Sequence, residues 1–268
     1  MAHQWPFTPR TLGARFVTEL TSGLKKPIVG IMQPYYFPYE GYFSYILNCD
    51  TFVLHENVQY TKKGWINRNR ILNQSGVTHL TLPLKDASDR THIGQRVISE
   101  SFDPLKQFRL IQGAYRKAPF WGELSDFLPN LLHPESSSLF DHLFLTISVI
   151  CNLLEIETTI MRSSDYGTIE DLRGQELVLE LCKRSGAASY LNPSGGRELY
   201  SHDVFAMNAI NLAFIEYSPA EYVQSSNNKH SDSGSIFQER LSILDTLAEV
   251  GVEETKRRVR SSFTISTD

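Results

Sequence analysis

The sequence predicts an α/β fold, a Rossmann-like layered sheet with additional helices, and the same pattern is compatible with a mixed sheet. Two apolar runs of strand length, residues 28–32 and 51–54, indicate buried strands. Between them, the aromatic and aliphatic residues of 42–47 are spaced as one face of a short helix. Strand, turn, helix and strand in this order are typical of α/β domains. Ligands of such sheets gather at the carboxyl ends of the strands, here at Gln33 and at 55–59.

The rest of the chain continues the alternation of apolar strand-like runs and helical patterns. Asp103 and Pro104 are suited to the start of a helix, the first as its N-cap and the second in its first turn. Further strands are expected at 78–84, 97–99, 158–161, 189–191 and 210–217. Further helices are expected at 103–117, 120–132, 136–154, 168–185, 202–208 and 237–250.

The pattern predicts a single α/β domain over residues 26–252, in which 103–156 is a candidate helical subdomain. Residues 1–25 are expected to form a flexible lead-in. The Ser- and Asn-rich stretch 225–235 is expected to be a mobile polar loop. Residues 253–268 contain a cluster of Lys and Arg and are expected to form a solvated basic tail.

Composition excludes several classes of protein. A formal net charge of −4 over 268 residues argues against a sequence-independent hold on nucleic acid, which needs many cations. The three cysteines are far apart, which predicts a reducing compartment and no disulfide framework. No apolar run approaches the ~20 residues of a membrane span. We therefore expect a cytoplasmic protein that is not a membrane protein.

One segment of the chain is basic although the net charge of the protein is negative. Residues 57–84 contain no Asp or Glu but do contain Lys62, Lys63, Arg68 and Arg70. Such a patch suits an anionic ligand such as a phosphate or carboxylate, which Arg binds through two hydrogen bonds. A solvated basic hairpin or loop explains the same spacing equally well.

Three other features are candidates for chemistry. His55 follows a predicted strand beside Glu56 and can act as a base near neutral pH, although an ordinary polar residue at a strand end is the commoner case. Asp245 lies in an apolar helical stretch and needs a partner if it is buried. The turn 192–196 carries a glycine pair that lets N–H groups face a ligand, but it matches no known phosphate loop. No metal-binding motif is present.

Several sequence blocks together resemble one known family. The blocks are IMQPYYFPYEGYF, VQYTKKGWINRNRI, YLNPSGG, YVQ and LSILDTLAEVG, and their order spans residues 27–251. They resemble the WbqC-like protein family, whose members are known from gene clusters for O-antigen and other surface polysaccharides. The resemblance implies a transferase that moves an amino, aminoacyl or acyl group in the biosynthesis of modified, nucleotide-linked sugars.

The polar residues that match the family blocks are the candidate site residues. They are Gln33, Tyr36, Tyr42, Gln59, Lys62, Trp65, Asn67, Arg68, Asn192, Gly196, Tyr222, Gln224, Ser242 and Asp245. The chain departs from the family at 55–57, where His55-Glu56-Asn57 replaces a frequent pair of acids. This departure puts a shared substrate or activity in question.

These residues suggest a binding site for a small anionic substrate, a nucleotide-sugar. Lys62 and Arg68 would hold phosphates, and Trp65 and Tyr36 would stack on the sugar or base. The amides of Gln33, Gln59 and Asn67 would orient hydroxyl groups. Tyr42, Asn192, Gly196, Tyr222 and Gln224 would complete the substrate site, and Asp245 or His55 would be the catalytic base.

Two other functions remain open. One is a non-catalytic protein that binds a nucleotide-sugar, and the other is a transferase acting on a modified nucleic-acid base, which the acidic composition disfavours. The sequence identifies no cofactor, no metal site and no oligomeric state.

Overall fold

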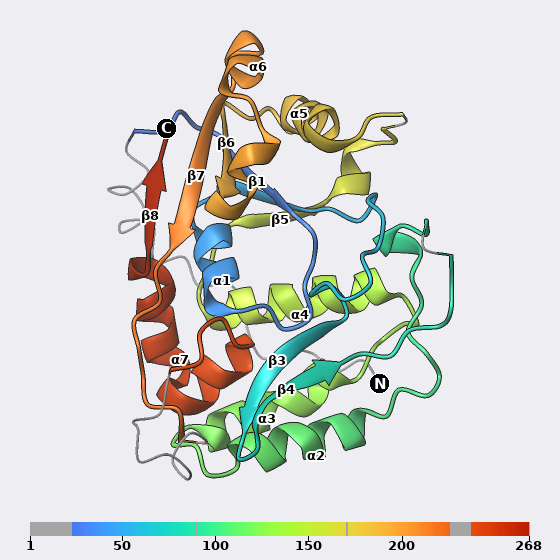
Figure 1. Cartoon of the computed structure of the whole chain (residues 1–268), viewed down its shortest axis with the longest axis vertical. Helices are drawn as coiled ribbons and strands as arrows, with labels where there is room; N and C mark the ends of the chain where they lie inside the picture. The colour runs from blue at the N-terminus through green and yellow to red at the C-terminus, as the bar shows by residue number, and fades with distance from the viewer. Residues whose placement is uncertain (1–22, 89, 170, 226–236, 268) are drawn as a thin grey trace.

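A computed structural model describes residues 23–88, 90–169, 171–225 and 237–267 of the chain. Its centre is a six-stranded sheet in the order β5-β2-β1-β6-β7-β8 (Figure 1). The first five strands in that order are parallel, and β8 runs antiparallel to β7. The strands are β1 (Ile28–Met32), β2 (Thr51–Leu54), β5 (Thr159–Arg162), β6 (Ser189–Pro193), β7 (Asn211–Tyr217) and β8 (Phe263–Ser266). The predicted α/β fold is confirmed, with a mixed sheet.

The helices cover both faces of this sheet, and a separate hairpin lies below it in Figure 1. The helices are α1 (Glu40–Leu47), α2 (Pro104–Tyr115), α3 (Trp121–Leu132), α4 (Leu139–Leu153), α5 (Gly174–Arg184), α6 (His202–Met207) and α7 (Ile243–Ser261). Short 3-10 helices are η1 (Ile93–Gln95), η2 (Ser163–Tyr166) and η3 (Ser194–Leu199). The hairpin is β3 (Arg68–Asn73) with β4 (Gly76–Thr81). Within the described residues no helix has the length and apolar character needed to span a membrane.

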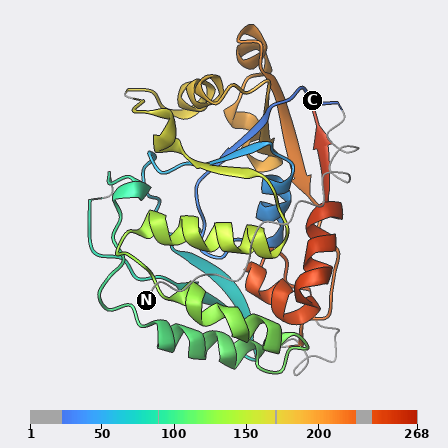
Figure 2. The same ribbon diagram turned by 180° about the vertical axis from the view of Figure 1, so that it is seen from behind.

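Alternating side chains of the strands enter two hydrophobic cores, because neighbouring residues of a strand point to opposite faces. Ile28 of β1 packs into a large core with α1, α2, α3, α4, α7 and the hairpin. Its neighbours Val29 and Ile31 pack into a smaller core with α5 and α6 on the other face (Figure 2). A strand that is buried on both faces needs apolar residues throughout. For this reason, the continuous apolar run 28–32 was sufficient to predict strand β1 from the sequence.

The hairpin lies in the second half of the basic stretch 57–84. Arg68 and Arg70 lie on β3, which pairs with β4 in the register Arg68↔Thr81 and Arg70↔His79. The predicted strand 78–84 therefore starts and ends earlier than expected, because the tight turn before Gly76 (φ 105°) sets the register. The expected strand 97–99 forms only isolated bridges, Leu84↔Ile98 and Val97↔Ser138.

The predicted helix 168–185 begins later than expected, at Gly174. The chain before it adopts left-handed backbone conformations at Gly167 (φ 81°), Asp171 (φ 62°) and Gly174 (φ 53°). A helix cannot continue through such residues. Residues 163–166 instead form η2, and 167–169 and 171–173 are irregular segments that line the candidate site.

The expectation of a solvated basic tail is wrong. Helix α7 runs on to Ser261, with a break at Gly251 (φ 79°), and β8 then adds an edge strand to the sheet. Arg258 is 5% exposed, and its Nε lies 2.9 Å from Oε2 of Glu40 on α1. Several residues of the expected tail, such as Arg258 and Val259, are therefore buried in the fold. Most of the predicted lead-in 1–25 and most of the predicted loop 225–235 lie outside the described residues.

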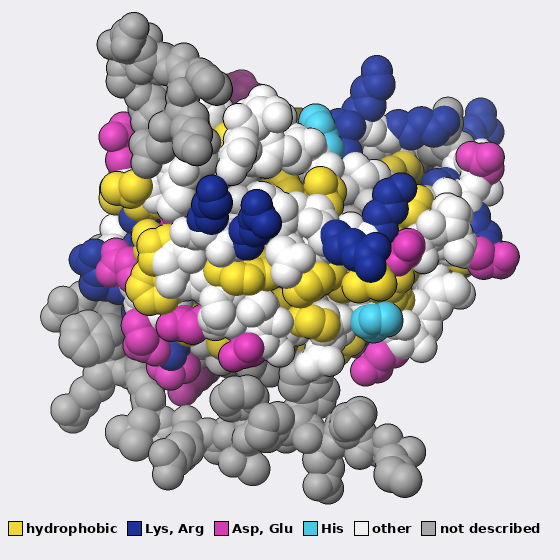
Figure 3. Space-filling view, turned by 90° about the horizontal axis from the view of Figure 1, so that it is seen from below, with side chains coloured by type: hydrophobic (Ala, Val, Ile, Leu, Met, Phe, Trp, Pro, Cys, Tyr) yellow, Lys and Arg dark blue, Asp and Glu magenta, His cyan; other side chains and the backbone are white. Residues whose placement is uncertain are grey.

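The surface carries uneven charge despite the overall value of −4. Figure 3 views the molecule from the side of α2 and α3. Lys and Arg side chains lie across the middle and upper right of this face, whereas most Asp and Glu side chains lie at its margins. A negative net charge of the whole chain is therefore compatible with a local basic surface.

Candidate functional site

The carboxyl ends of the parallel strands form one edge of the sheet, where polar segments follow each strand. Strand β1 lies between β2 and β6, and the chain continues from it to β2 on one side and only later to β6 on the other. Such a reversal of strand order is a topological switch point, beside which α/β proteins bind their ligands. The segments that follow β2 and β5 at this edge begin at His55 and Ser163.

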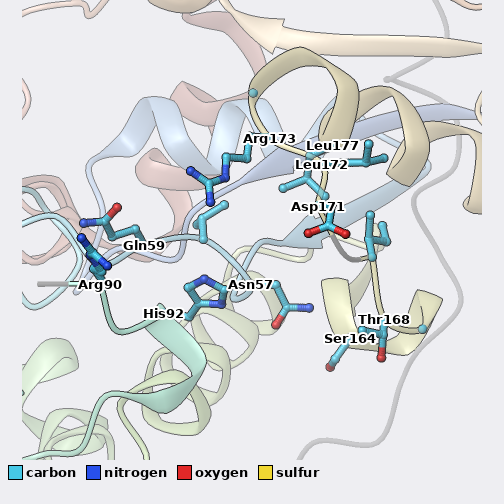
Figure 4. Close-up of a pocket in the computed structure, with 14 residues that line it drawn as sticks. Asn57, Gln59, Arg90, His92, Ser164, Thr168, Asp171, Leu172, Arg173 and Leu177 are labelled. Atoms are coloured by element: carbon cyan, nitrogen blue, oxygen red, sulfur yellow. The ribbon is translucent and has the colours of Figure 1, made fainter. Parts of the chain in front are cut away.

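A cavity of about 1090 Å³ opens at this edge, next to the ends of β2 and β5 and the start of α5 (Figure 4). It is lined by Asn57, Val58, Gln59, Arg90, His92, Ser164, Gly167, Thr168, Ile169, Asp171, Leu172, Arg173, Gly174 and Leu177. The volume is large enough for a ligand of drug or cofactor size. The walls combine a few apolar side chains with amide, hydroxyl and charged groups.

The charged groups of the cavity are unevenly distributed. In Figure 4, Arg90 lies at the left beside Gln59, and the guanidinium group of Arg173 lies in the upper middle, between Arg90 and Asp171. Asp171 lies to the right of Arg173, Ser164 and Thr168 lie at the lower right, and the His92 ring lies below Arg173 (Figure 4). Among the described residues, neither arginine forms an ion pair with a carboxylate. No described carboxylate therefore competes with an anionic ligand for either guanidinium group.

Behind this wall, Glu56 connects three segments of the chain. Its backbone N–H donates to Oγ of Ser163 (3.1 Å), and its Oε1 accepts a hydrogen bond from Oγ of Ser164 (2.5 Å). Its carbonyl accepts a hydrogen bond from the N–H of Gly94 (3.1 Å). Gly94 leaves room for the carboxylate, because a Cβ there would lie 2.9 Å from Oε2 of Glu56. Glu56 is thus held in place and in turn orients a hydroxyl group of the cavity.

His55 lies next to this group but is only 6% exposed and does not line the cavity. Neither of its ring nitrogens has a hydrogen-bond partner among the described residues. Burial, and secondarily the proximity of His92, lowers the pKa of His55 to about 4. At neutral pH the ring is therefore uncharged. The prediction that His55 is a catalytic base stays untested.

Gln59 is the one predicted site residue that lines this cavity. Its backbone pairs with His92 in an isolated antiparallel bridge. This bridge brings the segment after β2 and the segment before η1 together. The resulting wall carries Gln59, Arg90 and His92, which come from two separate parts of the chain.

The other residues predicted from the first two sequence blocks mostly form internal contacts. Tyr36 is fully buried and donates its hydroxyl to Oε1 of Gln107 (2.7 Å), and the hydroxyl of Tyr42 donates to the carbonyl of Gln33 (2.9 Å). Asn67 accepts from the hydroxyl of Tyr60 (2.7 Å) and donates to the carbonyl of Leu82 (2.8 Å). These bonds shape the loop around the hairpin.

The predicted cationic and aromatic residues of the basic loop lie outside the cavity. The Arg68 guanidinium donates to the backbone carbonyls of Lys63 and Gly64. Lys62 is exposed, and Trp65 is 38% exposed with the Arg70 guanidinium 5.5 Å from its ring centre. Their predicted role in binding phosphate or sugar therefore requires a ligand that extends beyond the cavity.

Asp245 is the centre of a buried cluster of hydrogen bonds. It accepts from the hydroxyl groups of Tyr115 (2.9 Å) and Tyr222 (2.6 Å) and from Nε2 of Gln224 (3.1 Å). Burial raises the pKa of Asp245 to about 6, although these hydrogen bonds lower it. Ser242 caps the same helix by accepting from the N–H of Leu244 (3.3 Å). The cluster connects α7 to α2 and to 222–224, and none of its members lines the cavity.

Hydrogen bonds and a close contact hold the turn at the end of β6 in a compact conformation. Oδ1 of Asn192 accepts from the hydroxyl of Tyr190 (2.9 Å), and its Nδ2 donates to the carbonyl of Pro193 (3.0 Å). A Cβ at Gly196 would collide with Nδ2 of Asn192, so only glycine fits there. Strands β1 and β6 are parallel neighbours, so Gln33 and this turn share one edge of the sheet.

Sequence reasoning missed most of the residues that line the cavity. The missed residues with charged, imidazole or hydroxyl side chains are Arg90, His92, Ser164, Thr168, Asp171 and Arg173. Of these residues, Ser164 was the easiest to predict from the sequence, because it follows the strand expected at 158–161. The others lie in segments that no periodic pattern distinguishes from ordinary polar loops. Within the described residues, no three His, Cys, Asp or Glu side chains gather as metal ligands.

Comparison with known proteins agrees with the resemblance that the sequence blocks carry. The uncharacterized protein Rv1507c of Mycobacterium tuberculosis is 29% identical to this chain over 229 residues. The aligned region covers 84% of this chain and 94% of that protein. A family model described as the WbqC-like protein family matches residues 33–257, which includes every strand of the sheet except β1 and β8. The chain therefore belongs to the WbqC-like protein family.

Proposed function

We propose that this protein is a transferase that moves an amino, aminoacyl or acyl group on a nucleotide-linked sugar. The product would serve the biosynthesis of a surface polysaccharide such as an O-antigen. The observation that carries the proposal is the cavity of about 1090 Å³ at the carboxyl edge of the sheet, into which Arg90 and Arg173 project from separate segments. Two guanidinium groups that form no ion pair with another described residue suit the phosphates of a nucleotide.

The surroundings of the arginines support the same assignment. Arg173 directly precedes α5, and Gly174 and Leu177 of the first turn also line the cavity. Arg173 is the N-cap residue of this helix, and its side chain makes no capping hydrogen bond. The positive end of the helix dipole adds to the attraction for an anion. The apolar side chains of Val58, Leu172 and Leu177 provide contact area for a sugar or base.

The chemistry requires a base inside the cavity. Transfer of an acyl or aminoacyl group to a sugar amine forms a C–N bond, breaks the bond to the donor and releases one proton from nitrogen. A base that accepts this proton must lie within hydrogen-bond reach of the nucleophile. His92 lines the cavity, whereas His55 and Asp245 do not. We therefore assign the role of base to His92.

The test is isothermal titration calorimetry with UDP-, dTDP-, GDP- and CMP-linked sugars. Each variant Arg90→Ala and Arg173→Ala should raise the dissociation constant of the bound nucleotide-sugar by about 10- to 100-fold, because each removes a charge-assisted hydrogen bond worth roughly 1.5–3 kcal/mol. The control Arg109→Ala removes an exposed guanidinium on α2, away from the cavity, and should leave the dissociation constant unchanged.

Three outcomes discriminate among the alternatives. An unchanged dissociation constant in both cavity variants, with a loss in Arg68→Ala, would move the phosphates to the basic loop. Tight binding without turnover under any donor and acceptor would favour a non-catalytic nucleotide-sugar binding protein. Absence of binding to all four nucleotide classes would contradict the proposal, and a steep salt dependence of DNA binding would then favour a nucleic-acid substrate.

A further inference from the structure

One hydroxyl group of the cavity wall is bonded to a buried carboxylate. Ser164 and Thr168 supply the hydroxyl side chains among the lining residues. Of these two, Ser164 is the one that donates to a carboxylate within the described part of the chain, at 2.5 Å from Oε1 of Glu56. Ser164 is itself exposed and lies two residues after β5, at the carboxyl edge of the sheet. A ligand in the cavity can therefore reach this side chain.

Glu56 is held in a position to accept the proton of this hydroxyl. It is 8% exposed, and its backbone forms hydrogen bonds to Ser163 and Gly94. A Cβ on residue 94 would lie 2.9 Å from Oε2 of Glu56, so glycine there leaves the room that the carboxylate needs. A nucleophile within hydrogen-bond reach of a base is the arrangement that covalent catalysis requires. A carboxylate can serve as this base, as a histidine can.

A second serine of the described chain forms a similar bond away from the cavity. Ser225 donates its hydroxyl to Oε2 of Glu249 (2.6 Å), and its N–H donates to Oε1 of the same carboxylate (2.9 Å). Neither residue lines the cavity. This pair connects the segment 222–225 to α7, whereas the pair of Ser164 and Glu56 lies at the cavity wall. Ser225 is therefore a matched control for the chemistry of Ser164.

We propose that Ser164 is a nucleophile that carries the transferred acyl or aminoacyl group as an ester, with Glu56 as its base. In the first step, Oγ of Ser164 bonds to the acyl carbon of the donor, and the hydroxyl proton passes to Glu56. The bond to the leaving group breaks, and the donor is an activated acyl compound such as a thioester, whose leaving group departs as an anion.

In the second step, the amine of the sugar attacks the ester on Ser164 and forms the C–N bond. One proton of the amine passes to His92, and Glu56 returns its proton to Oγ as the ester bond breaks. Both side chains of the pair are thereby regenerated. This inference rests on the proposed function, selects its acyl or aminoacyl form, and adds a covalent intermediate to it.

The experiment measures the reaction of the full-length protein with p-nitrophenyl acetate and with diisopropyl fluorophosphate, two probes of activated serines. The wild-type protein should release a stoichiometric burst of p-nitrophenol, and peptide mass spectrometry should find the acetyl or phosphoryl group on Ser164. Ser164→Ala should lose both the burst and the label. Glu56→Gln keeps the size of the side chain and an acceptor oxygen but cannot take a proton, so it should slow both reactions by about 100-fold or more.

The control Ser225→Ala should keep the burst and the label, because its hydroxyl lies outside the cavity. Thermal unfolding of each variant shows whether it is folded, and the position of the label in the wild-type protein needs no variant. Labels on Ser225 or on lysines, with none on Ser164, would overturn the nucleophile. Equal labelling rates in folded Glu56→Gln and wild-type protein would overturn the base.

Calorimetry with nucleotide-sugars separates this inference from the proposed function. Binding that is lost in Arg173→Ala, in a protein whose Ser164 takes no label, would leave the proposed function standing with direct transfer to the amine. A label on Ser164 in a protein that binds no nucleotide-sugar would overturn the proposed function and keep Ser164 as a nucleophile. Absence of both would overturn both.

Discussion

At the scale of single residues, the unusual groups are two buried histidines without hydrogen-bond partners. His142 on α4 is 2% exposed, and its ring centre lies 6.0 Å from that of Tyr36. Neither ring nitrogen of His142 or His55 has a partner among the described residues. Burial lowers the pKa of each ring from 6.5 to about 4, because a charged imidazole would lose its hydration.

The pH dependence of stability follows from the direction of this shift. The unfolded chain takes up a proton at each ring near pH 6.5, whereas the folded chain does so only near pH 4. The unfolded state therefore binds more protons in this interval, and stability is full above pH 6.5 and falls as the pH decreases towards 4. From pH 7 to pH 5 each histidine should cost about 2 kcal/mol of unfolding free energy.

His142→Phe tests this prediction, because phenylalanine keeps a planar ring and cannot be protonated. Urea denaturation should show that the loss of unfolding free energy between pH 7 and 5 is smaller by about 2 kcal/mol in the variant than in the wild-type protein. The comparison within each variant cancels any packing cost. The control His133→Phe changes an exposed histidine at the end of α3 and should keep the wild-type loss. An equal loss in His142→Phe would show that this ring is not the acid-sensitive group.

At the scale of elements, the position of α1 on β1 depends on a missing side chain. A Cβ at Gly30 in the middle of β1 would lie 2.6 Å from Sγ of Cys49 and 2.9 Å from ring atoms of Tyr45 and Phe52. All three neighbours are buried and have little room to move. Overpacking of this kind typically costs about 1–3 kcal/mol. Glycine thus lets α1 pack closely on the sheet beneath the candidate site.

Gly30→Ala should therefore lower the unfolding free energy by about 1–3 kcal/mol in urea denaturation. Gly113→Ala provides a control of opposite sign. It lies within α2, is exposed, and would bring its Cβ near no other atom. Alanine in a helix should raise stability there by roughly 0.5–1 kcal/mol. A neutral effect of Gly30→Ala would mean that α1 can move away from β1 without cost.

At the scale of the whole molecule, a buried ion pair connects α7, near the end of the described chain, to α1. Nε of Arg258 on α7 lies 2.9 Å from Oε2 of Glu40 on α1, and its Nη2 donates to the carbonyl of Ala220. Burial raises the pKa of Glu40, and the Arg258 charge opposes that rise. Removal of one partner leaves an uncompensated charge in the core.

Arg258→Met should consequently destabilise the protein by about 3–5 kcal/mol, as measured by chemical denaturation. The double variant with Glu40→Leu should recover much of this loss, because no buried charge remains. Arg257→Met is the matched control: the neighbouring Arg257 forms an exposed pair with Glu254, and its loss should cost less than about 1 kcal/mol. A cost for Arg258→Met as small as that of Arg257→Met would refute a structural role of the pair.

Much of the fold was predictable from the sequence, because apolar runs and helix-capping residues are local sequence patterns. The strands at 28–32 and 51–54 were predicted with the bounds that β1 and β2 have. The start of α2 was predicted from its cap, since the carboxylate of Asp103 accepts from the N–H of Lys106 (3.0 Å). The start of α5 and the extent of α7 were not predicted. They depend on single left-handed residues such as Gly174 and Gly251, whose conformation is set by surrounding structure.

The sequence by itself determined that this is an α/β protein of the WbqC-like family, because continuous apolar runs, helix caps and family blocks are local properties of the chain. Only the tertiary structure decided which polar residues meet. It placed Asp245 in a buried cluster with Tyr222 and Gln224, and it brought Arg90, His92, Asp171 and Arg173 together around the cavity. These four come from two loops about 80 residues apart in sequence, and loops carry no periodic signal that records their partners.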